Sequence, residues 1–313
     1  MIRAVRAKPG SPQRLEIAEV EERPPFSNEA LVRVTAFSLN RGEVRRSERA
    51  DRPIRIGWDI AGTVERAAAD GSSPPEGARV VGFSPRMEGW AERTAIPGSY
   101  LCSIPDRVSD AAAATLPVAG LTALHSIDAG DCLIGARVLV TGATGGVGVF
   151  AAQLARLGGA EVVSQVRRED QRAFADRIGL GTVLVSPDGS GIEDAGPYRL
   201  VVDGVAGPIL EAGVRSLGPE GLAVCYGVTA APAISVVVGE FMTRGLARIL
   251  GFHLYYKSEI APPRDHLARL LRLVEQGRLD TAIEREASWK EVAHTADDLI
   301  ERRFPGKAVL HVD

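Results

Sequence analysis

The chain has 313 residues, of which 45% are hydrophobic and 25% are charged, and its formal net charge at pH 7 is −3. This length is enough for about two domains with sizeable cores. The slightly acidic balance, without a broad basic stripe, argues against nucleic acid as the main partner. No apolar stretch of the sequence approaches the roughly 20 residues of a membrane-spanning helix, so we expect no membrane partner.

The cysteines and the first residues predict the compartment. Cys102, Cys132 and Cys225 lie far apart and are odd in number, which is typical of reduced thiols in the cytoplasm. Residues 1–6 lack the apolar segment of a secretory signal peptide. We therefore expect a cytoplasmic protein.

The first third of the chain is rich in predicted strands. Short alternating runs occur at residues 2–7, 15–20, 30–36, 60–66, 79–83 and 90–96, with turn clusters between them. Short strands at this spacing favour a compact, mostly antiparallel barrel or sandwich.

From about Ala136 the pattern changes to strands that alternate with helices. The predicted strands are residues 138–140, 161–166, 182–186, 200–204 and 222–226. This alternation predicts an α/β domain with a doubly wound parallel sheet and helices on both faces. Two helices, at 265–276 and 289–303, and a last strand at 307–312 follow. That last strand could rejoin the first domain.

A glycine-rich turn follows the first strand of this region. Residues 141–148 read Thr-Gly-Ala-Thr-Gly-Gly-Val-Gly, and apolar residues at helical spacing come next. A strand, a glycine turn and a helix present backbone N–H groups and the positive helix end to a pyrophosphate. Glycine is needed there because a Cβ would hold the phosphate away from the backbone. The segment therefore predicts a dinucleotide site.

The end of the next strand predicts which dinucleotide binds. An NAD site usually has an Asp or Glu about 20 residues beyond the turn, on the ribose 2′-hydroxyl. Here Val166 is followed by Arg167 and Arg168, and the first acid is Glu169. Two guanidinium groups suit a 2′-phosphate, and no carboxylate takes the place beside it. We predict NADP(H); the alternative is that one or both arginines only contact solvent at a helix start.

Further motifs follow in a fixed order over nearly the whole chain. They are residues 38–40 (SLN), 57–64 (GWDIAGTV), 76–80 (EGARV), 89–92 (GWAE), 116–123 (LPVAGLTA), 201–205 (VVDGV) and 306–310 (GKAVL). Together with the glycine turn, they resemble the medium-chain dehydrogenase/reductase superfamily, in particular its zinc-free quinone oxidoreductase-like branch. The resemblance implies a β-rich, GroES-like catalytic domain from residues 1–115 and 251–313. It also implies a Rossmann NADP-binding domain with a doubly wound parallel sheet at residues 116–250.

Two positions of these motifs bear on metal binding. Zinc-dependent relatives have a Cys and a His where this chain has Asn40 and Trp58, and an amide and an indole cannot supply the thiolate and imidazole that Zn²⁺ needs. No Cys-x-x-Cys occurs, and no two of the five histidines stand at ligand spacing. We therefore predict no metal ion. Simple alcohol oxidation is then disfavoured, whereas hydride transfer to a quinone or an α,β-unsaturated carbonyl needs no metal.

The resemblance also implies which residues contact the cofactor. They are Thr144, Gly145, Gly146 and Val147 at the pyrophosphate, Arg167 and Arg168 at the 2′-phosphate, Asn40 and Thr122 near the nicotinamide and its ribose, Tyr226, Gly227, Phe252 and Leu254 along the cofactor, and Arg302 or Arg303 at the adenosine phosphate. Phe252 and Leu254 could equally be core residues, and Thr122 could cap a helix. Asp203, at the end of a central strand, could lie near the ligand or act as a structural cap.

The catalytic candidates are Asn40 and Tyr255. The segment after Asn40 (residues 41–46, RGEVRR) has Glu43 where an Asp is usual, and it carries no tyrosine, so the obvious enol-protonating phenol is missing. A proton could instead come from water, Tyr255 or Tyr256. The arginines of this segment would favour an acidic substrate if they faced the site, or they could simply be solvated.

These observations predict an NADPH-dependent, zinc-independent oxidoreductase that reduces a quinone or an α,β-unsaturated carbonyl compound by hydride transfer. One alternative is an NADPH-binding redox sensor or partner-binding module with little catalysis. Another is an enoyl-thioester reductase. The expected partner is a small-molecule substrate, and because relatives are commonly dimers through the central domain, we expect a homodimer.

Overall fold

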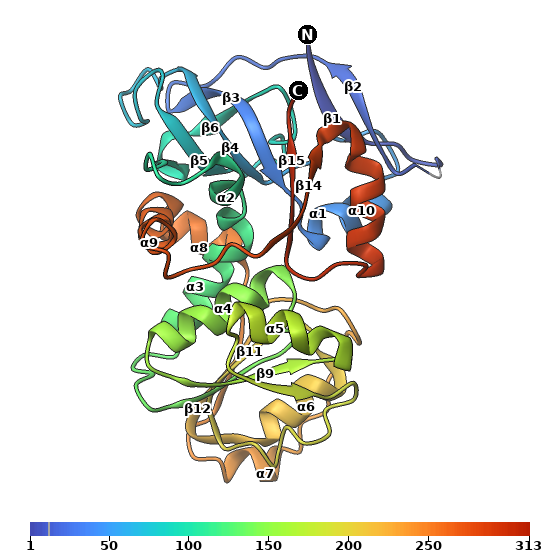
Figure 1. Ribbon diagram of the computed structural model, residues 1–313, viewed down its shortest axis with the longest axis vertical. Helices are drawn as coiled ribbons and strands as arrows, with labels where there is room; N and C mark the ends of the chain where they lie inside the picture. The colour runs from blue at the N-terminus through green and yellow to red at the C-terminus, as the bar shows by residue number, and fades with distance from the viewer. Residues whose placement is uncertain (12) are drawn as a thin grey trace. The chain divides into compact units, whose positions relative to one another are not determined.

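The computed structural model describes residues 1–11 and 13–313. It divides into two compact units (Figure 1). Met1–Leu121 and Tyr255–Asp313 form the first, which we name the β-rich unit, and Thr122–Leu254 form the second, the parallel-sheet unit. The boundaries predicted from the sequence fall after residues 115 and 250.

A mostly antiparallel sheet organises the β-rich unit. Its central strand β3 (Glu29–Ser38) pairs antiparallel with β4 (Asp59–Arg66), β6 (Arg93–Pro97) and β15 (Lys307–His311). The sheet continues with β5 (Arg79–Phe83) and β7 (Leu101–Ser103) beyond β4 and with β14 (Ile283–Ser288) beyond β15, and β1 (Ile2–Ala7) pairs with β2 (Leu15–Val20) separately. Ala30, Val32 and Val34 of β3 are buried at every second position, as a strand with one face on a core requires.

Short helices fill the remainder of the β-rich unit. They are α1 (Arg41–Glu48), η1 (Gly98–Tyr100), α2 (Asp110–Ala114), the π-helix η2 (Leu116–Gly120), α8 (Leu254–Ile260), α9 (Pro263–Glu275), η4 (Trp289–Glu291) and α10 (Val292–Glu301). The first residue of α8, Leu254, belongs to the parallel-sheet unit. The core beneath α1 and α10 includes Phe37 and Trp90, whose rings stack with centroids 5.0 Å apart.

The C-terminal strand confirms one expectation and the neighbouring segments correct others. β15 joins the sheet of the first residues, with Val309 opposite Ser38. The strand expected at 90–96 begins only at Arg93 because Trp90 turns into the core, fully buried. The helix expected at 289–303 is a 3₁₀ turn followed by α10, and α1 and β14 were not predicted. β14 escaped notice because its edge position leaves charged side chains exposed, which hides the alternation.

Six parallel strands form the sheet of the parallel-sheet unit, in the order β10-β9-β8-β11-β12-β13. Their bounds are β8 (Arg137–Val140), β9 (Glu161–Val166), β10 (Thr182–Val185), β11 (Tyr198–Asp203), β12 (Leu217–Cys225) and β13 (Arg248–Gly251). In chain order this is 3-2-1-4-5-6, the order of a doubly wound dinucleotide-binding sheet. The α/β fold class is therefore confirmed.

Helices cover both faces of this sheet (Figure 1). Helices α4 (Gly146–Leu157) and α5 (Arg172–Ile178) lie on one face, and α6 (Gly207–Arg215) packs on the other. The remaining helices are α3 (Leu121–Asp128), η3 (Glu169–Gln171) and α7 (Val238–Met242). Residues Val138 to Val140 are fully buried, because a central parallel strand is covered on both faces.

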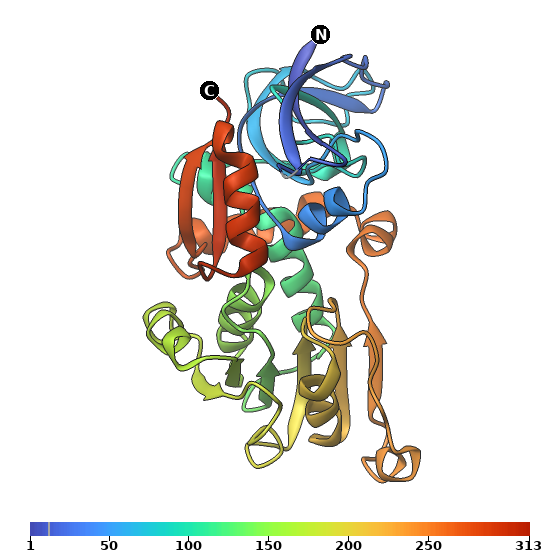
Figure 2. The same ribbon diagram turned by 90° about the vertical axis from the view of Figure 1, so that its right-hand side faces the viewer.

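The edge strand β13 is the sixth strand and was not predicted. All four of its residues are exposed, so it lacks the buried apolar run that identified the other strands. Figure 2 shows β13 and α7, in orange, at the outer edge of the sheet. Among the described residues, no helix combines the length and the apolar character that crossing a membrane requires.

Candidate cofactor turn and buried polar site

The glycine turn lies at the carboxyl end of β8, where a doubly wound sheet binds its ligand. Thr141 Oγ1 donates to Asp203 Oδ1 at 2.5 Å, and Asp203 Oδ2 accepts from the Ala206 N–H at 2.8 Å. Asp203 is fully buried, and burial raises the pKa of its carboxyl against the effect of the Thr141 hydrogen bond. Its carboxylate thus joins the ends of β8 and β11, and this geometry favours the structural-cap interpretation of Asp203.

Close packing explains the last glycine of the turn. A Cβ on Gly148 would lie 2.5 Å from the Gly142 carbonyl oxygen and 2.8 Å from Ala143 Cα, which no real Cβ can do. Gly142 itself has a φ of +56°, a conformation that favours glycine. Helix α4 can therefore begin directly beside β8, and its first N–H groups, at Gly146 and Val147, have no partner within the helix.

A glutamine connects this turn to the two arginines after β9. Gln171 Oε1 accepts from the backbone N–H groups of Arg167 at 3.0 Å and Arg168 at 3.1 Å. Gln171 Nε2 donates to Thr144 Oγ1 at 2.7 Å. The structure therefore brings Thr144, Arg167 and Arg168 into one hydrogen-bonded assembly, whose arginine side chains are exposed. Gln171 was not predicted as a site residue, since a polar residue at a helix start carries no signal of its own.

Two further predicted contacts follow β12. Tyr226 lies over Gly204, because a Cβ added to Gly204 would be 2.5 Å from the Tyr226 Oη. Gly227 approaches the same residue, its own Cβ position being 3.2 Å from the Gly204 carbonyl oxygen. Burial raises the pKa of the Tyr226 phenol above its ordinary value, and the Asp203 charge adds to the rise. Both residues thus stand at the carboxyl end of the sheet with the glycine turn.

Three predicted residues lie close to the ends of the parallel-sheet unit. Phe252 directly follows β13, and its ring centroid is 6.1 Å from that of His125 on α3. Leu254 is 9% exposed and Thr122 is 5% exposed. Thr122 lies in the first turn of α3, where its carbonyl oxygen accepts from Ser126 Oγ at 2.7 Å.

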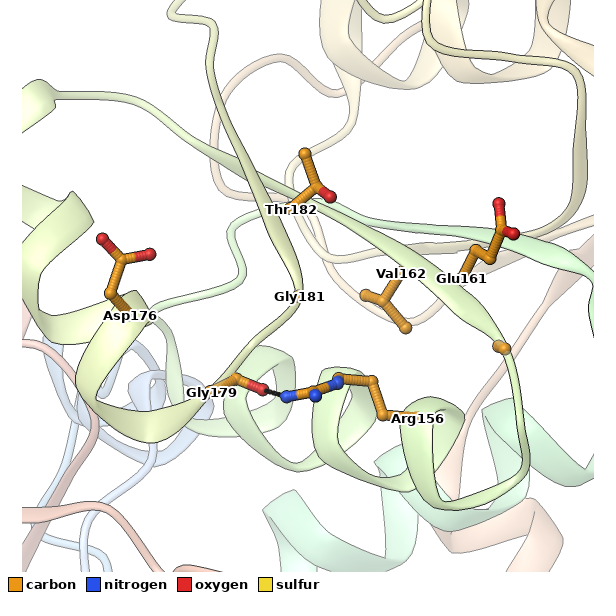
Figure 3. Close-up of a pocket in the computed structure, with 8 residues that line it drawn as sticks. Arg156, Glu161, Val162, Asp176, Gly179, Gly181 and Thr182 are labelled. Carbon is orange, nitrogen blue, oxygen red and sulfur yellow. Dashed lines mark hydrogen bonds between the residues drawn. The ribbon is translucent and has the colours of Figure 1, made fainter.

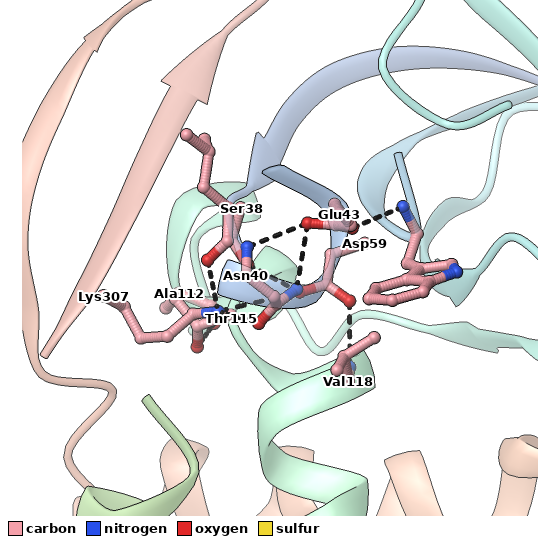
Figure 4. Close-up of polar contacts among 10 residues, drawn as sticks. Ser38, Asn40, Glu43, Asp59, Ala112, Thr115, Val118 and Lys307 are labelled. Carbon is pink, nitrogen blue, oxygen red and sulfur yellow. Dashed lines mark hydrogen bonds and ion pairs between the residues drawn. The ribbon is translucent and has the colours of Figure 1, made fainter. Parts of the chain in front are cut away.

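A buried polar network occupies the β-rich unit at the end of β3 (Figure 4). Asp59 Oδ2 accepts from Ser38 Oγ and from Asn40 Nδ2, both at 2.7 Å, and lies 3.7 Å from Lys307 Nζ. Asp59 Oδ1 accepts from the Val118 N–H at 2.9 Å. Asp59 is fully buried and Lys307 is 1% exposed. The network therefore ties β3, β4, η2 and the C-terminal strand β15 together.

Asn40 lies at the centre of this network, and its carboxamide is held at both ends. Lys307 Nζ donates to Asn40 Oδ1 at 2.8 Å, while Asn40 Nδ2 faces Asp59 Oδ2 at 2.7 Å and Glu43 Oε2 at 3.4 Å. If the amide were flipped, its NH₂ group would face the Lys307 ammonium and its carbonyl oxygen would face the Asp59 and Glu43 carboxylates. The three partners therefore fix the orientation of the amide. Asn40 can accept one more hydrogen bond at Oδ1 and cannot supply a proton.

Glu43 completes the network from α1. Its Oε2 accepts from the Asn40 N–H at 2.8 Å and its Oε1 accepts from the Trp58 N–H at 2.7 Å. Burial, and then the nearby Asp59, raise the pKa of Glu43 well above its ordinary value. Burial also raises the pKa of Asp59 and lowers that of Lys307, and the attraction between these two opposes both shifts. Glu43 and Asp59 thus share one buried environment, and Lys307 is the cation that opposes the repulsion between them.

The predicted acid Tyr255 belongs to the same unit and lies against Trp58. The Trp58 Nε1–H donates to the Tyr255 Oη, and the two rings meet edge to face with centroids 5.9 Å apart. Burial raises the pKa of the Tyr255 phenol to about 12. The other candidate, Tyr256, is 67% exposed. The geometry thus favours Tyr255 over Tyr256.

The remaining arginine candidates occupy α1 and the end of α10. Arg41 Nη1 donates to the carbonyl oxygens of Leu299 and Ile300, both at 3.2 Å, so this arginine closes a helix end. Arg302 terminates α10 with a φ of +60°. Arg303 forms an ion pair with Asp298 at 2.8 Å.

A groove of about 480 Å³ lies on the parallel-sheet unit, away from the turn (Figure 3). Its lining includes Arg156, Glu161, Asp176 and Thr182. Glu161 and Thr182 begin β9 and β10, so the groove is at the amino ends of the strands. Ligands of such sheets bind at the carboxyl ends, and we therefore do not assign the groove to the cofactor. Among the described residues, no group of three or more His, Cys, Asp or Glu could hold a metal ion.

Comparisons with known proteins agree with this geometry. Residues 27–106 match the family model of the alcohol dehydrogenase GroES-like domain, and residues 146–274 match that of the zinc-binding dehydrogenases. The chain is 27% identical over 310 residues to quinone oxidoreductase-like protein 2 of Bos taurus, covering 95% of this chain and 88% of that protein. It is 24% identical over 338 residues to the acryloyl-coenzyme A reductase of Sulfurisphaera tokodaii, covering 96% and 98%.

A third relative is much longer. A phenolphthiocerol/phthiocerol polyketide synthase of Mycobacterium tuberculosis is 26% identical over 325 residues, which cover 97% of this chain and 14% of the synthase. The chain thus spans about one seventh of that relative. Among solved structures, a mycobacterial protein complexed with NADPH superposes with a TM-score of 0.87 at 23% identity, covering 99% of this chain and 100% of that one. The chain belongs to the medium-chain dehydrogenase/reductase superfamily, in its quinone oxidoreductase-like branch.

Proposed function

We propose that the protein is an NADPH-dependent reductase that transfers hydride to a quinone or an α,β-unsaturated carbonyl compound without a metal ion. The observation that carries the proposal is the assembly around Gln171, which joins the glycine turn to Arg167 and Arg168. An anion-binding helix start and two exposed guanidinium groups then belong to one local structure.

The fit to a phosphorylated dinucleotide rests on the charges after β9. The acid next in sequence, Glu169, forms an ion pair with Arg172 at 2.6 Å, whereas Asp170 forms an exposed ion pair with Arg168 at 3.0 Å. A 2′-phosphate would therefore compete with Asp170 for the Arg168 guanidinium, and Arg167 would bind it without such a competitor. Gly145, Gly146 and Val147 would hold the pyrophosphate through their N–H groups. Thr122, Tyr226, Gly227, Phe252, Leu254 and Arg302 are proposed as further cofactor contacts. The similar mycobacterial protein solved with NADPH supports this choice of dinucleotide.

Zinc does not fit the two positions that hold it in zinc-dependent relatives. The Asn40 amide is bonded to Lys307 and Asp59, and the Trp58 indole N–H is bonded to Tyr255. Neither group offers a thiolate or an imidazole. We therefore derive no step through a metal ion.

The proposed reaction needs a hydride, a proton and an orienting group. The bound nicotinamide would supply the hydride. Tyr255 would supply the proton, since a phenol whose pKa is about 12 is protonated at neutral pH. Asn40, whose amide hydrogens already face Asp59 and Glu43, would orient a donor group of the cofactor or substrate at Oδ1.

A screen of NADPH oxidation tests the proposal. Quinones, enones and enoyl-coenzyme A thioesters are offered one at a time to the purified chain, and we expect turnover with at least one of the first two classes. NADPH binding without turnover on any of them would favour the redox-sensor alternative. Preferred use of NADH would contradict the cofactor assignment.

An enoyl thioester is a second candidate substrate. The acryloyl-coenzyme A reductase aligns over nearly the whole chain, and three exposed arginines, Arg46, Arg49 and Arg52, lie at and just after the end of α1. Guanidinium groups suit the phosphates that such a substrate carries. A kcat/KM for crotonyl-coenzyme A far above that for simple enones would select this candidate.

We also propose that the protein forms a homodimer through the edge of the parallel sheet. Large apolar side chains are exposed on and near α7 and β13, namely Val237, Val238, Met242, Leu246, Ile249 and Leu250. A second copy would cover them and pair the open edge of β13. Sedimentation should show a dimer that Leu250→Lys converts to monomer. A cytoplasmic location stays a prediction.

A further inference from the structure

We infer that Trp58 is a positioning residue for the proton donor Tyr255: its indole N–H holds the phenol oxygen and stabilises the phenolate that proton transfer leaves. This inference rests on the proposed reductase function. It gives a role to a residue that stands where zinc-dependent relatives have a metal ligand.

The hydrogen bond between the two side chains has only one possible direction. An indole nitrogen is a donor and never an acceptor, so the Tyr255 Oη accepts from Trp58 Nε1. The phenol hydrogen must then point to a different acceptor. Trp58 therefore decides which way Tyr255 presents its proton.

Trp58 is held through both its backbone and its ring. Its backbone N–H donates to Glu43 Oε1 at 2.7 Å, and the far edge of the indole packs against Gly42, where an added Cβ would lie 3.0 Å from the ring. The Tyr255 ring meets Phe83 edge to face with centroids 5.2 Å apart. Residues on α1 and β5 thus hold both partners, so the geometry does not depend on one flexible side chain.

The charges around Tyr255 come from α1. Glu43 raises the pKa of the phenol, whereas Arg46 and the hydrogen bond from Trp58 lower it, and burial outweighs them all. Removing the indole N–H would therefore make Tyr255 a weaker acid. The effect follows because a donor that contacts an oxygen stabilises the anion more than the neutral group.

Bound NADPH would supply the hydride to the β-carbon, which would leave the electron pair of the double bond on an enolate. The Tyr255 O–H bond would then break, the proton would join the α-carbon, and the phenolate would remain bonded to the indole N–H of Trp58. Solvent would return a proton to the phenolate, so each turnover would consume one proton from the medium.

Steady-state kinetics of Trp58→Phe and Tyr255→Phe test the inference, with Tyr256→Phe as the matched control because Tyr256 is its exposed neighbour. For Trp58→Phe we expect kcat to fall about tenfold, since a hydrogen bond to a charged group is lost, with the KM for NADPH unchanged and the solvent isotope effect on kcat increased. Tyr255→Phe should lower kcat less in the Trp58→Phe background than in the wild type. If Trp58 were merely structural, Trp58→Phe would lower stability, but the solvent isotope effect would not increase and the losses of kcat would be additive.

A double-mutant cycle of chemical unfolding with the same two variants provides a measurement without cofactor. We expect a coupling between Trp58→Phe and Tyr255→Phe, because each variant removes the same bond. Additive losses overturn the inference. The inference is also overturned if Trp58→Phe keeps the kcat and the isotope effect of the wild type while Tyr255→Phe is impaired. The proposed function would stand in that case. Absence of turnover by the wild type with every substrate would instead end the proposed function, and the inference with it.

Discussion

The β-rich unit buries its functional charges, whereas the parallel-sheet unit exposes them. Asp59 and Lys307 are at most 1% exposed and face each other through Asn40. Arg167 and Arg168 instead have exposed side chains beyond β9, where Gln171 holds their backbone N–H groups and Arg168 forms an exposed ion pair with Asp170 at 3.0 Å. Charges that the fold already partners set stability and geometry, and charges left in solvent are available to a ligand.

This difference predicts opposite results for the two kinds of charge. Substitutions in the buried network should change the free energy of unfolding and affect ligands only indirectly. Substitutions of the exposed arginines should change cofactor affinity and leave the free energy of unfolding almost unaltered.

The largest effect is expected for Lys307→Met. Removing one partner of a buried ion pair leaves the carboxylates of Asp59 and Glu43 uncompensated, which costs about 3–5 kcal/mol of unfolding free energy. Urea unfolding measures the loss. Lys290→Met is the matched control, because its ion pair with Asp313, at 3.3 Å, is exposed and should contribute at most about 1 kcal/mol. Equal losses for the two variants would mean that burial does not distinguish them.

The next effect is expected at the glycine turn. In Gly148→Ala the new methyl group would lie 2.5 Å from the Gly142 carbonyl oxygen, so β8 and α4 must separate, at a cost of about 1–3 kcal/mol. NADPH binding, measured by fluorescence titration, should weaken as well because the turn changes shape. Gly239→Ala is the control, since nothing lies within 4 Å of its Cβ position. A Gly148→Ala variant with the stability and NADPH affinity of the wild type would show that Gly148 is not closely packed.

The exposed arginines should respond to the choice of cofactor. Arg167→Ala combined with Arg168→Ala removes charge-assisted hydrogen bonds of roughly 1.5–3 kcal/mol each at most. NADPH affinity should therefore fall by at least about tenfold, with NADH affinity and unfolding little changed. Equal losses for both cofactors would refute the assignment of these residues to the 2′-phosphate.

The sequence predicted the parallel-sheet unit better than the β-rich unit, for the same reason that separates their charges. Buried parallel strands and a glycine turn are local signals, so β8 to β12 and the start of α4 were found. Contacts such as Lys307 with Asn40, or Trp58 with Tyr255, join residues more than 190 positions apart, and no local pattern encodes them. Lys307 lay within a recognised motif, but its buried position and its partner became visible only in the structure.

The smallest effect concerns alkaline pH and Tyr255. Burial raises the pKa of this phenol to about 12 in the folded chain, above the value of about 10 for an exposed tyrosine. A group whose pKa is raised by folding stabilises the fold below the unfolded pKa, and this contribution is lost as the pH rises through the folded pKa. The free energy of unfolding should therefore decline between about pH 10 and pH 12. Tyr255→Phe should reduce that decline and Tyr256→Phe should not, because Tyr256 is exposed. An identical pH dependence in both variants would show that Tyr255 is not held by the buried contacts that keep it protonated.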